Sequence, residues 1–68
     1  MDVKERFGRA VKAARVEKGL SQEELAARID ADQAYVSRIE GGRMNVTLET
    51  ADQIAVALEV GLEMLLAS

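Results

Sequence analysis

The chain has 68 residues, 49% of them hydrophobic, so it fits one small domain whose core alone gives limited stability. It has no Cys and no His, which excludes disulfides and thiolate metal sites and removes the commonest general base, so we expect neither catalysis nor a metal or cofactor. The net charge is −3, but all nine basic residues lie in residues 1–45, so a nucleic-acid partner facing that part is not excluded.

The first predicted element is a helix that starts near Val3. From Val3 to Ala14, apolar residues recur at helical spacing, and Gly19 is a natural stop for the helix. Gly8 lies inside this pattern, whereas the other glycines stand at boundaries. With no Trp, one Phe and one Tyr, the core has to be built from Leu, Ile, Val, Met and Ala, whose small members let helices approach closely.

Residues 21–40, SQEELAARIDADQAYVSRIE, contain two short helical patterns joined by a tight turn. Ser21 and Glu24 form an S-x-x-E capping box that starts the first of these helices. Asp32 is a good N-cap for the second, whose buried side is Val36 and Ile39. The two patterns are too close for ordinary antiparallel helices, so they predict a helix-turn-helix.

The outer face of the second helix in this motif carries groups that can read bases. Four residues fall at helical positions i, i+1, i+4 and i+5, roughly opposite the buried side. They present amide, methyl, hydroxyl and guanidinium groups and no carboxylate. Arg can bind guanine, Gln can bind adenine, Ala can contact a thymine methyl, and Ser can donate or accept. The predicted base contacts are Gln33, Ala34, Ser37 and Arg38.

The rest of the chain predicts two more helices. Gly41 and Gly42 end the third helix, and residues 43–46 form a loop. Thr47 can cap a fourth helix that ends where Val60 and Gly61 break the pattern, and a last short helix carries Leu62, Leu65 and Leu66. No repeat or linker is visible, so we expect residues 1–68 to form a single all-α domain, a compact five-helix bundle.

The runs L-S-Q-E-E-L-A near residue 20 and Y-V-S-R-I-E-G-G-R at 35–43 resemble the lambda-repressor and Cro family of helix-turn-helix domains, also called the XRE family. The similarity extends from about Phe7 to Leu66. In size the chain is similar to small Cro-like repressors and to the controller proteins of restriction-modification systems. The resemblance implies a five-helix bundle, a two-fold dimer and a palindromic operator.

The resemblance also implies roles for single residues. Gln33, Ala34, Ser37 and Arg38 match its base-facing positions, and Arg15 with Glu40 matches a salt bridge between the first helix and the recognition helix. Asp30 stands where the family usually has Gly, and Gly61 where it often has Ser. The residues expected to contact DNA phosphates are Gln22, Arg43 and Asn45, to which Tyr35 is added because its hydroxyl could reach a phosphate, the alternative for its ring being core packing.

The C-terminal helix has more apolar surface than so short a helix can hide in one core. Leu62, Met64 and Leu65 are therefore expected in a homodimer interface, with Leu66 beside them. The alternative is that these side chains belong to an intramolecular core. A dimer would place two recognition helices in successive major grooves, about 34 Å apart.

The sequence predicts a regulator that binds a palindromic operator in double-stranded DNA and occludes or touches RNA polymerase at the promoter. Two alternatives stay open. The chain could be the antitoxin of a toxin–antitoxin pair, or a protein-interaction module that keeps the fold without the DNA face. No apolar run reaches the length of a membrane span, and residues 1–11 do not resemble a signal peptide. We expect no membrane partner and a cytoplasmic location, at a bacterial or phage nucleoid.

Overall fold

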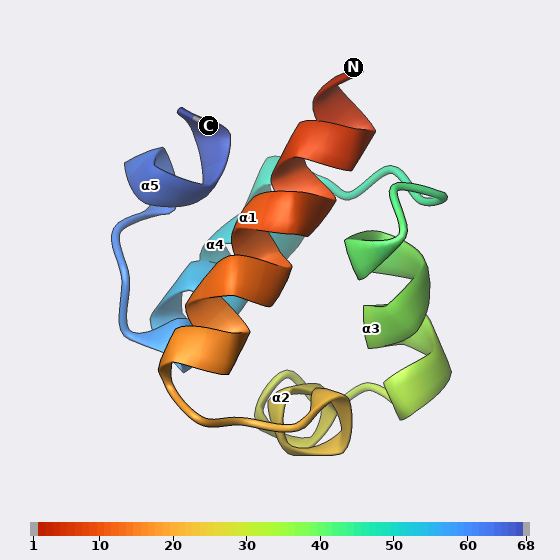
Figure 1. Ribbon diagram of the computed structural model, residues 1–68, viewed down its shortest axis with the longest axis vertical. Coiled ribbons are helices and arrows are strands. Elements are labelled where there is room, and N and C mark those ends of the chain that lie inside the picture. The colour runs from red at the N-terminus through yellow and green to blue at the C-terminus, as the bar shows by residue number, and fades with distance from the viewer. Residues whose placement is uncertain (1, 68) are drawn as a thin grey trace.

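A computed structural model describes residues 2–67, which form five α-helices and no strand. In Figure 1, α1 lies across the front with α4 behind it, while α2 lies near the end of α1 and α3 and α5 stand on opposite sides. The expected all-α, five-helix fold is confirmed. The helices are α1 (Val3–Glu17), α2 (Gln22–Arg28), α3 (Gln33–Glu40), α4 (Leu48–Leu58) and α5 (Leu62–Leu66).

The helix starts follow from local capping. Ser21 accepts from the Glu24 backbone N–H at 3.0 Å while the Glu24 carboxylate accepts from the Ser21 N–H at 2.8 Å, so the predicted capping box is present. Asp32 and Thr47 cap α3 and α4 as expected, whereas Gly61 starts α5 without a side-chain bond. A further capping box starts α1, where Asp2 pairs with the residue three positions on. The sequence signal for it, D-x-x-E, was present but not used.

The turn after α2 accommodates Asp30 at the position where the family usually has Gly. Asp30 has φ of 56°, so the turn between α2 and α3 takes the left-handed conformation at this position although the residue is not Gly. At the end of α4 the left-handed residue is Glu59, with φ of 60°, so α4 ends before the expected break at Val60 and Gly61. Two of the helix ends therefore carry backbone strain that a Gly would remove.

The core contains side chains from all five helices and places α3 firmly against the rest. Val36 and Ile39, the predicted buried side of α3, are 1% and 2% exposed. The apolar residues that form the core are Phe7, Val11, Leu25, Ala26, Val36, Ile39, Ala51, Ile54, Ala55, Leu58 and Leu65. The inner side of α3 is fixed by these contacts, which leaves the opposite side for a ligand.

Gly8 sets the distance between α1 and the end of α3. It is buried, and a Cβ built on it would lie 2.9 Å from the Glu40 carbonyl oxygen and closer still to that of Ile39. Because both atoms belong to the backbone, no side-chain rotation could relieve the contact. The absence of a side chain at residue 8 therefore allows α1 and α3 to lie this close.

Candidate nucleic-acid interface

The four predicted base-contact residues lie together on the outer face of α3. Gln33, Ala34 and Arg38 are exposed and Ser37 is half-buried. Since the opposite face of the helix is anchored by the core, the side chains on the outer face project from a fixed backbone. Their positions are those that a helix needs to place in a major groove. That they contact bases stays a prediction.

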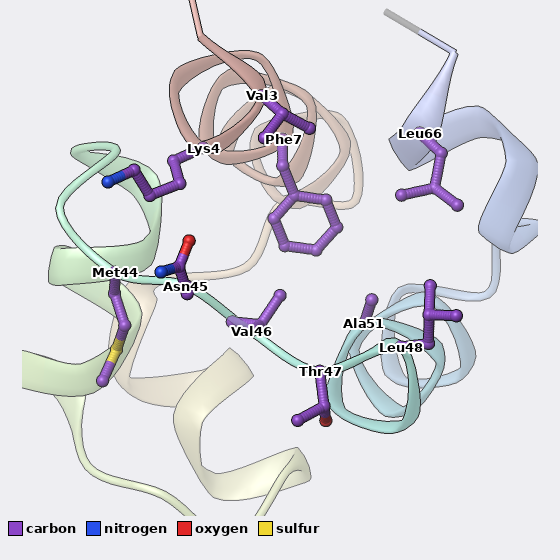
Figure 2. Close-up of a pocket in the computed structure, with 10 residues that line it drawn as sticks. All are labelled: Val3, Lys4, Phe7, Met44, Asn45, Val46, Thr47, Leu48, Ala51 and Leu66. Atoms are coloured by element: carbon purple, nitrogen blue, oxygen red, sulfur yellow. The ribbon is translucent and has the colours of Figure 1, made fainter.

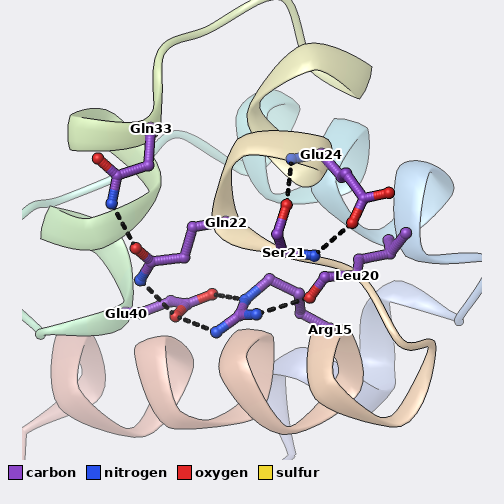
Figure 3. A network of polar contacts seen from close by, with 7 residues as sticks. All are labelled: Arg15, Leu20, Ser21, Gln22, Glu24, Gln33 and Glu40. Atoms are coloured by element: carbon purple, nitrogen blue, oxygen red, sulfur yellow. Dashed lines mark hydrogen bonds and ion pairs between the residues drawn. The ribbon is translucent and has the colours of Figure 1, made fainter.

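A buried ion pair joins α1 to the end of α3, as Figure 3 shows. Arg15 Nε donates to Glu40 Oε2 at 2.6 Å and Arg15 Nη2 donates to Glu40 Oε1 at 3.1 Å, so the pair is bidentate. Arg15 Nη1 also donates to the carbonyl oxygen of Leu20 at 2.7 Å, which ties the α1–α2 loop to the same guanidinium. The side chains are 10% and 4% exposed, and hydrogen bonding to Glu40 raises the pKa of Arg15 above its ordinary value.

Gln22 is held in the same network rather than standing free. Its Nε2 donates to Glu40 Oε1 at 3.0 Å, and its Oε1 accepts from Gln33 Nε2 at 2.5 Å. Figure 3 shows the Gln22 amide lying between the two partners. The side chain expected to bind a phosphate therefore already supports a predicted base-contact residue. A phosphate contact by Gln22 stays a prediction, and its remaining capacity for one is a single amide hydrogen.

The other predicted phosphate contacts flank the end of α3. Arg43 and Asn45 are exposed in the loop before α4, whereas Tyr35 is half-buried and packs against the core. Arg43 lies beside Gly41, because a Cβ built on Gly41 would be 3.4 Å from Arg43 Nε. The Arg43 charge therefore lies at the C-terminal end of α3.

Lys4 is a further cation near this loop that the sequence analysis did not identify. It lines the same cavity as Asn45, and Figure 2 shows its side chain reaching from α1 toward the loop. The two residues are 41 positions apart, so no local pattern links them. Only the packing of α1 against the α3–α4 loop brings these two residues to the same cavity.

The predicted dimer residues are divided by the structure. Leu65 is 1% exposed and belongs to the core, so its prediction as an interface residue is wrong: its own subunit already buries the side chain. Leu62 is half-buried against the core, and Met64 is 61% exposed beside α1. A helix of five residues was expected to have surplus apolar surface, but α5 turns Leu65 fully inward.

A further apolar surface lies around a shallow cavity of about 180 Å³ between α1, α4, α5 and the α3–α4 loop (Figure 2). Phe7 forms part of its lining. Three exposed side chains stand around it, Val3 at 60%, Leu48 at 70% and Leu66 at 48%. Val3 and Leu48 fit the helical apolar patterns of the sequence, yet their side chains are not covered. We call Val3, Leu48 and Leu66 the apolar rim.

None of the helices within residues 2–67 has both the length and the apolar character needed to cross a bilayer. Over the same residues, no three potential metal-ligating side chains gather closely enough to hold an ion.

Comparison with known proteins identifies relatives over almost the whole chain. The family model described as helix-turn-helix matches residues 11–65. Control protein C.MunI from Mycoplasma is 47% identical over 62 residues, covering 90% of this chain and 84% of that protein.

Solved structures of similar proteins have the same fold as this chain. The restriction-modification controller protein C.AhdI from Aeromonas hydrophila superposes with a TM-score of 0.85 at 38% identity, covering 90% of this chain and 88% of that one. The hypothetical transcription factor NHTF from Neisseria gives a TM-score of 0.90 at 38% identity, over 96% of this chain and 75% of that one.

Proposed function

This chain belongs to the helix-turn-helix family of DNA-binding transcription regulators, and we propose that it binds a palindromic operator as a homodimer through α3. The observation that carries the proposal is the outer face of α3, where four side chains able to read bases project from a helix fixed by the core. Arg38 would bind guanine and Gln33 adenine, with Ala34 against a thymine methyl and Ser37 as donor or acceptor.

Phosphate contacts would position this helix. Arg43 and Asn45 in the loop after α3, with Lys4 beside them, supply two charges and one amide near one end of the recognition helix. Gln22 and Tyr35 are the candidates near the other end. With a net charge of −3 the protein has little general attraction for DNA, so affinity has to come from such placed contacts and from dimerisation.

The apolar rim would hold the second copy. Three large exposed apolar side chains line this cavity, and in a two-fold interface the same patch faces itself, so apolar surface would cover apolar surface. The rim borders the loop that leaves α3, so a two-fold axis passing through the rim would lie near both recognition helices. The separation then required is about 34 Å, one turn of B-DNA.

The dimer is tested by sedimentation of Leu48→Glu beside Val56→Glu. The two residues are 70% and 68% exposed on the same helix, but only Leu48 stands on the apolar rim. We expect Leu48→Glu to be monomeric and Val56→Glu to sediment as the unmodified protein does. A wild-type monomer, or equal behaviour of the two variants, would contradict this interface.

The DNA site is tested by selecting bound sequences from a random pool of duplexes. The unmodified protein should enrich a palindrome with half-sites one helical turn apart. Arg38→Ala should weaken binding by about 1–3 kcal/mol and relax the preference at one base pair per half-site. Arg43→Ala should weaken all sequences equally and lower the salt slope by about one. The absence of any enriched motif would reject the proposal.

The names of the relatives favour one biological role. C.MunI is a control protein and C.AhdI is a restriction-modification controller protein. We therefore extend the proposal to transcriptional control of a restriction-modification gene pair. The test is a reporter gene transcribed from the promoter of a neighbouring methyltransferase and nuclease gene pair, with the selected operator in its upstream region. Transcription that does not change with protein concentration would separate DNA binding from this role.

A further inference from the structure

A continuous chain of hydrogen bonds runs from the interior of the protein to the proposed DNA surface. Arg15 of α1 binds Glu40 of α3, Glu40 accepts from Gln22 of α2, and Gln22 accepts from Gln33 of α3 (Figure 3). The first two side chains are 10% and 4% exposed, Gln22 is half-buried, and Gln33 is exposed. This series of hydrogen bonds thus has a fixed inner end at Arg15 and an outer end at Gln33 on the recognition face.

The chemistry of the inner end sets the direction of every bond. A guanidinium can only donate, and a carboxylate can only accept. Gln22 must therefore turn its NH₂ group to Glu40, which leaves its carbonyl oxygen to face Gln33. That oxygen can only accept, so Gln33 must donate one of its two amide hydrogens. The groups left free on Gln33 are its carbonyl oxygen and its second amide hydrogen.

We propose that Glu40, acting through Gln22, is a positioning residue that makes Gln33 specific for adenine. In the major groove adenine presents a donor, N6–H, next to an acceptor, N7, and these match the free oxygen and the free hydrogen of Gln33. Guanine presents two acceptors there, so its O6 would face the Gln33 oxygen. This inference rests on the proposed function, because it needs α3 to lie in the major groove.

The effect is one of orientation, not of affinity for DNA in general. An unsupported Gln can rotate its amide by half a turn and exchange its oxygen and nitrogen, which changes the pattern that it presents. Here a half-turn of the Gln33 amide would place its oxygen against the oxygen of Gln22, and a half-turn of the Gln22 amide would place its oxygen against the Glu40 carboxylate. The buried ion pair therefore selects one of the two orientations before DNA binds.

The test measures base preference at the position that Gln33 reads. The unmodified protein should prefer adenine to guanine there by about tenfold, the discrimination of one bidentate contact. Glu40→Gln keeps the size of the side chain but can present a donor or an acceptor, so the preference should fall below about threefold. The preference at the position read by Arg38 should stay unchanged. Glu23→Gln is the matched control, since it removes the same charge from an exposed residue outside the chain of bonds.

A compensating variant separates this role from a structural one. In Gln22→Glu with Glu40→Gln, residue 22 becomes an acceptor only, so Gln33 must again donate to it and the amide at residue 40 can donate to residue 22. The adenine preference should return to within about twofold of the original, even if total affinity falls because of the new charge near DNA. A structural defect at residue 40 would not be repaired in this way.

The outcomes are distinguishable. If the unmodified protein selects no motif, the proposed function fails and this inference with it. If it selects a motif but Glu40→Gln keeps the adenine preference, or the compensating variant does not restore it, the inference alone is overturned. If circular dichroism shows that Glu40→Gln does not fold, Gln22→Met decides the matter. This variant removes the hydrogen bonds that link Glu40 to Gln33 and leaves the ion pair intact. An unchanged preference in that variant also overturns the inference.

Discussion

The substitution Gly8→Ala gives a sharp test of how the recognition helix is held. Alanine is the better helix former, and in the interior of a helix the change would by itself stabilise the protein by about 0.5–1 kcal/mol. In this structure the new methyl group would lie 2.9 Å from the Glu40 carbonyl oxygen and nearer to that of Ile39. Helix propensity and packing therefore predict changes of opposite sign.

The magnitude follows from the contact. Carbon–oxygen separations of 3.4–4 Å are ordinary, so α1 and the end of α3 would have to separate by about 1 Å. Overpacking of this kind costs about 1–3 kcal/mol, and backbone atoms on both sides put it near the upper end. After subtracting the gain in propensity, we expect the free energy of unfolding to fall by about 2 kcal/mol. The displaced carbonyls belong to the last turn of α3, so DNA affinity should fall as well.

The assay is urea unfolding followed by far-UV circular dichroism at matched protein concentration, because association would itself shift the transition. Ala13→Gly is the control, since it makes the reverse change at an exposed position of α1 and should cost about 0.5–1 kcal/mol. If Gly8→Ala proves more stable than the unmodified protein by the amount that Ala13→Gly loses, the close approach of α1 and α3 at Gly8 is refuted.

Three further predictions concern the ion pair, the turn and one carboxylate. Arg15→Met leaves the carboxylate of Glu40, 4% exposed, without its ion-pair partner and should cost about 3–5 kcal/mol in urea unfolding. The double variant Arg15→Met with Glu40→Met should return to within about 1 kcal/mol of the original stability, and equal losses in the two variants would contradict the pairing. Asp30→Gly should raise the free energy of unfolding by about 0.5–1 kcal/mol, because φ at this residue is 56°, and no gain in the midpoint of urea unfolding would argue against strain there. Hydrogen bonds from the backbone and side chain of Ser21 lower the pKa of Glu24, so the stability that this carboxylate adds is present above its ordinary pKa and is lost as the pH falls through the lowered one. In an NMR titration Ser21→Ala should move the Glu24 pKa part of the way upward, because alanine keeps the backbone N–H and loses only the hydroxyl; an unmoved pKa would refute the contribution of the Ser21 side chain.

The features that were predictable from sequence are those whose cause is local. The capping box of Ser21 and Glu24 spans three positions, and the face of α3 that carries Gln33 and Arg38 follows from the helical repeat alone. The fit of Asp30 to a left-handed turn position was also foreseeable, because Asp is one of the few residues that tolerate it.

Predictions about surfaces were less successful, since burial depends on what packs from elsewhere. Leu65 was expected at an interface because its helix looked too apolar for one core, yet the neighbouring helices cover it fully. Val3 and Leu48 fit apolar patterns, but their side chains stay exposed. Lys4 and Asn45 line the same cavity although they are far apart in the sequence. A pattern gives the direction of a side chain on its helix but not the distance to the next helix.

By itself, then, the sequence determined the five helices, their caps and the polar outer face of the recognition helix, because hydrogen bonds and helical periodicity act over a few residues. The tertiary structure alone decided which apolar residues stay exposed and how Gln22 connects Glu40 to Gln33, since those contacts join α2 to α3 and the separation of these helices is set by packing in the core.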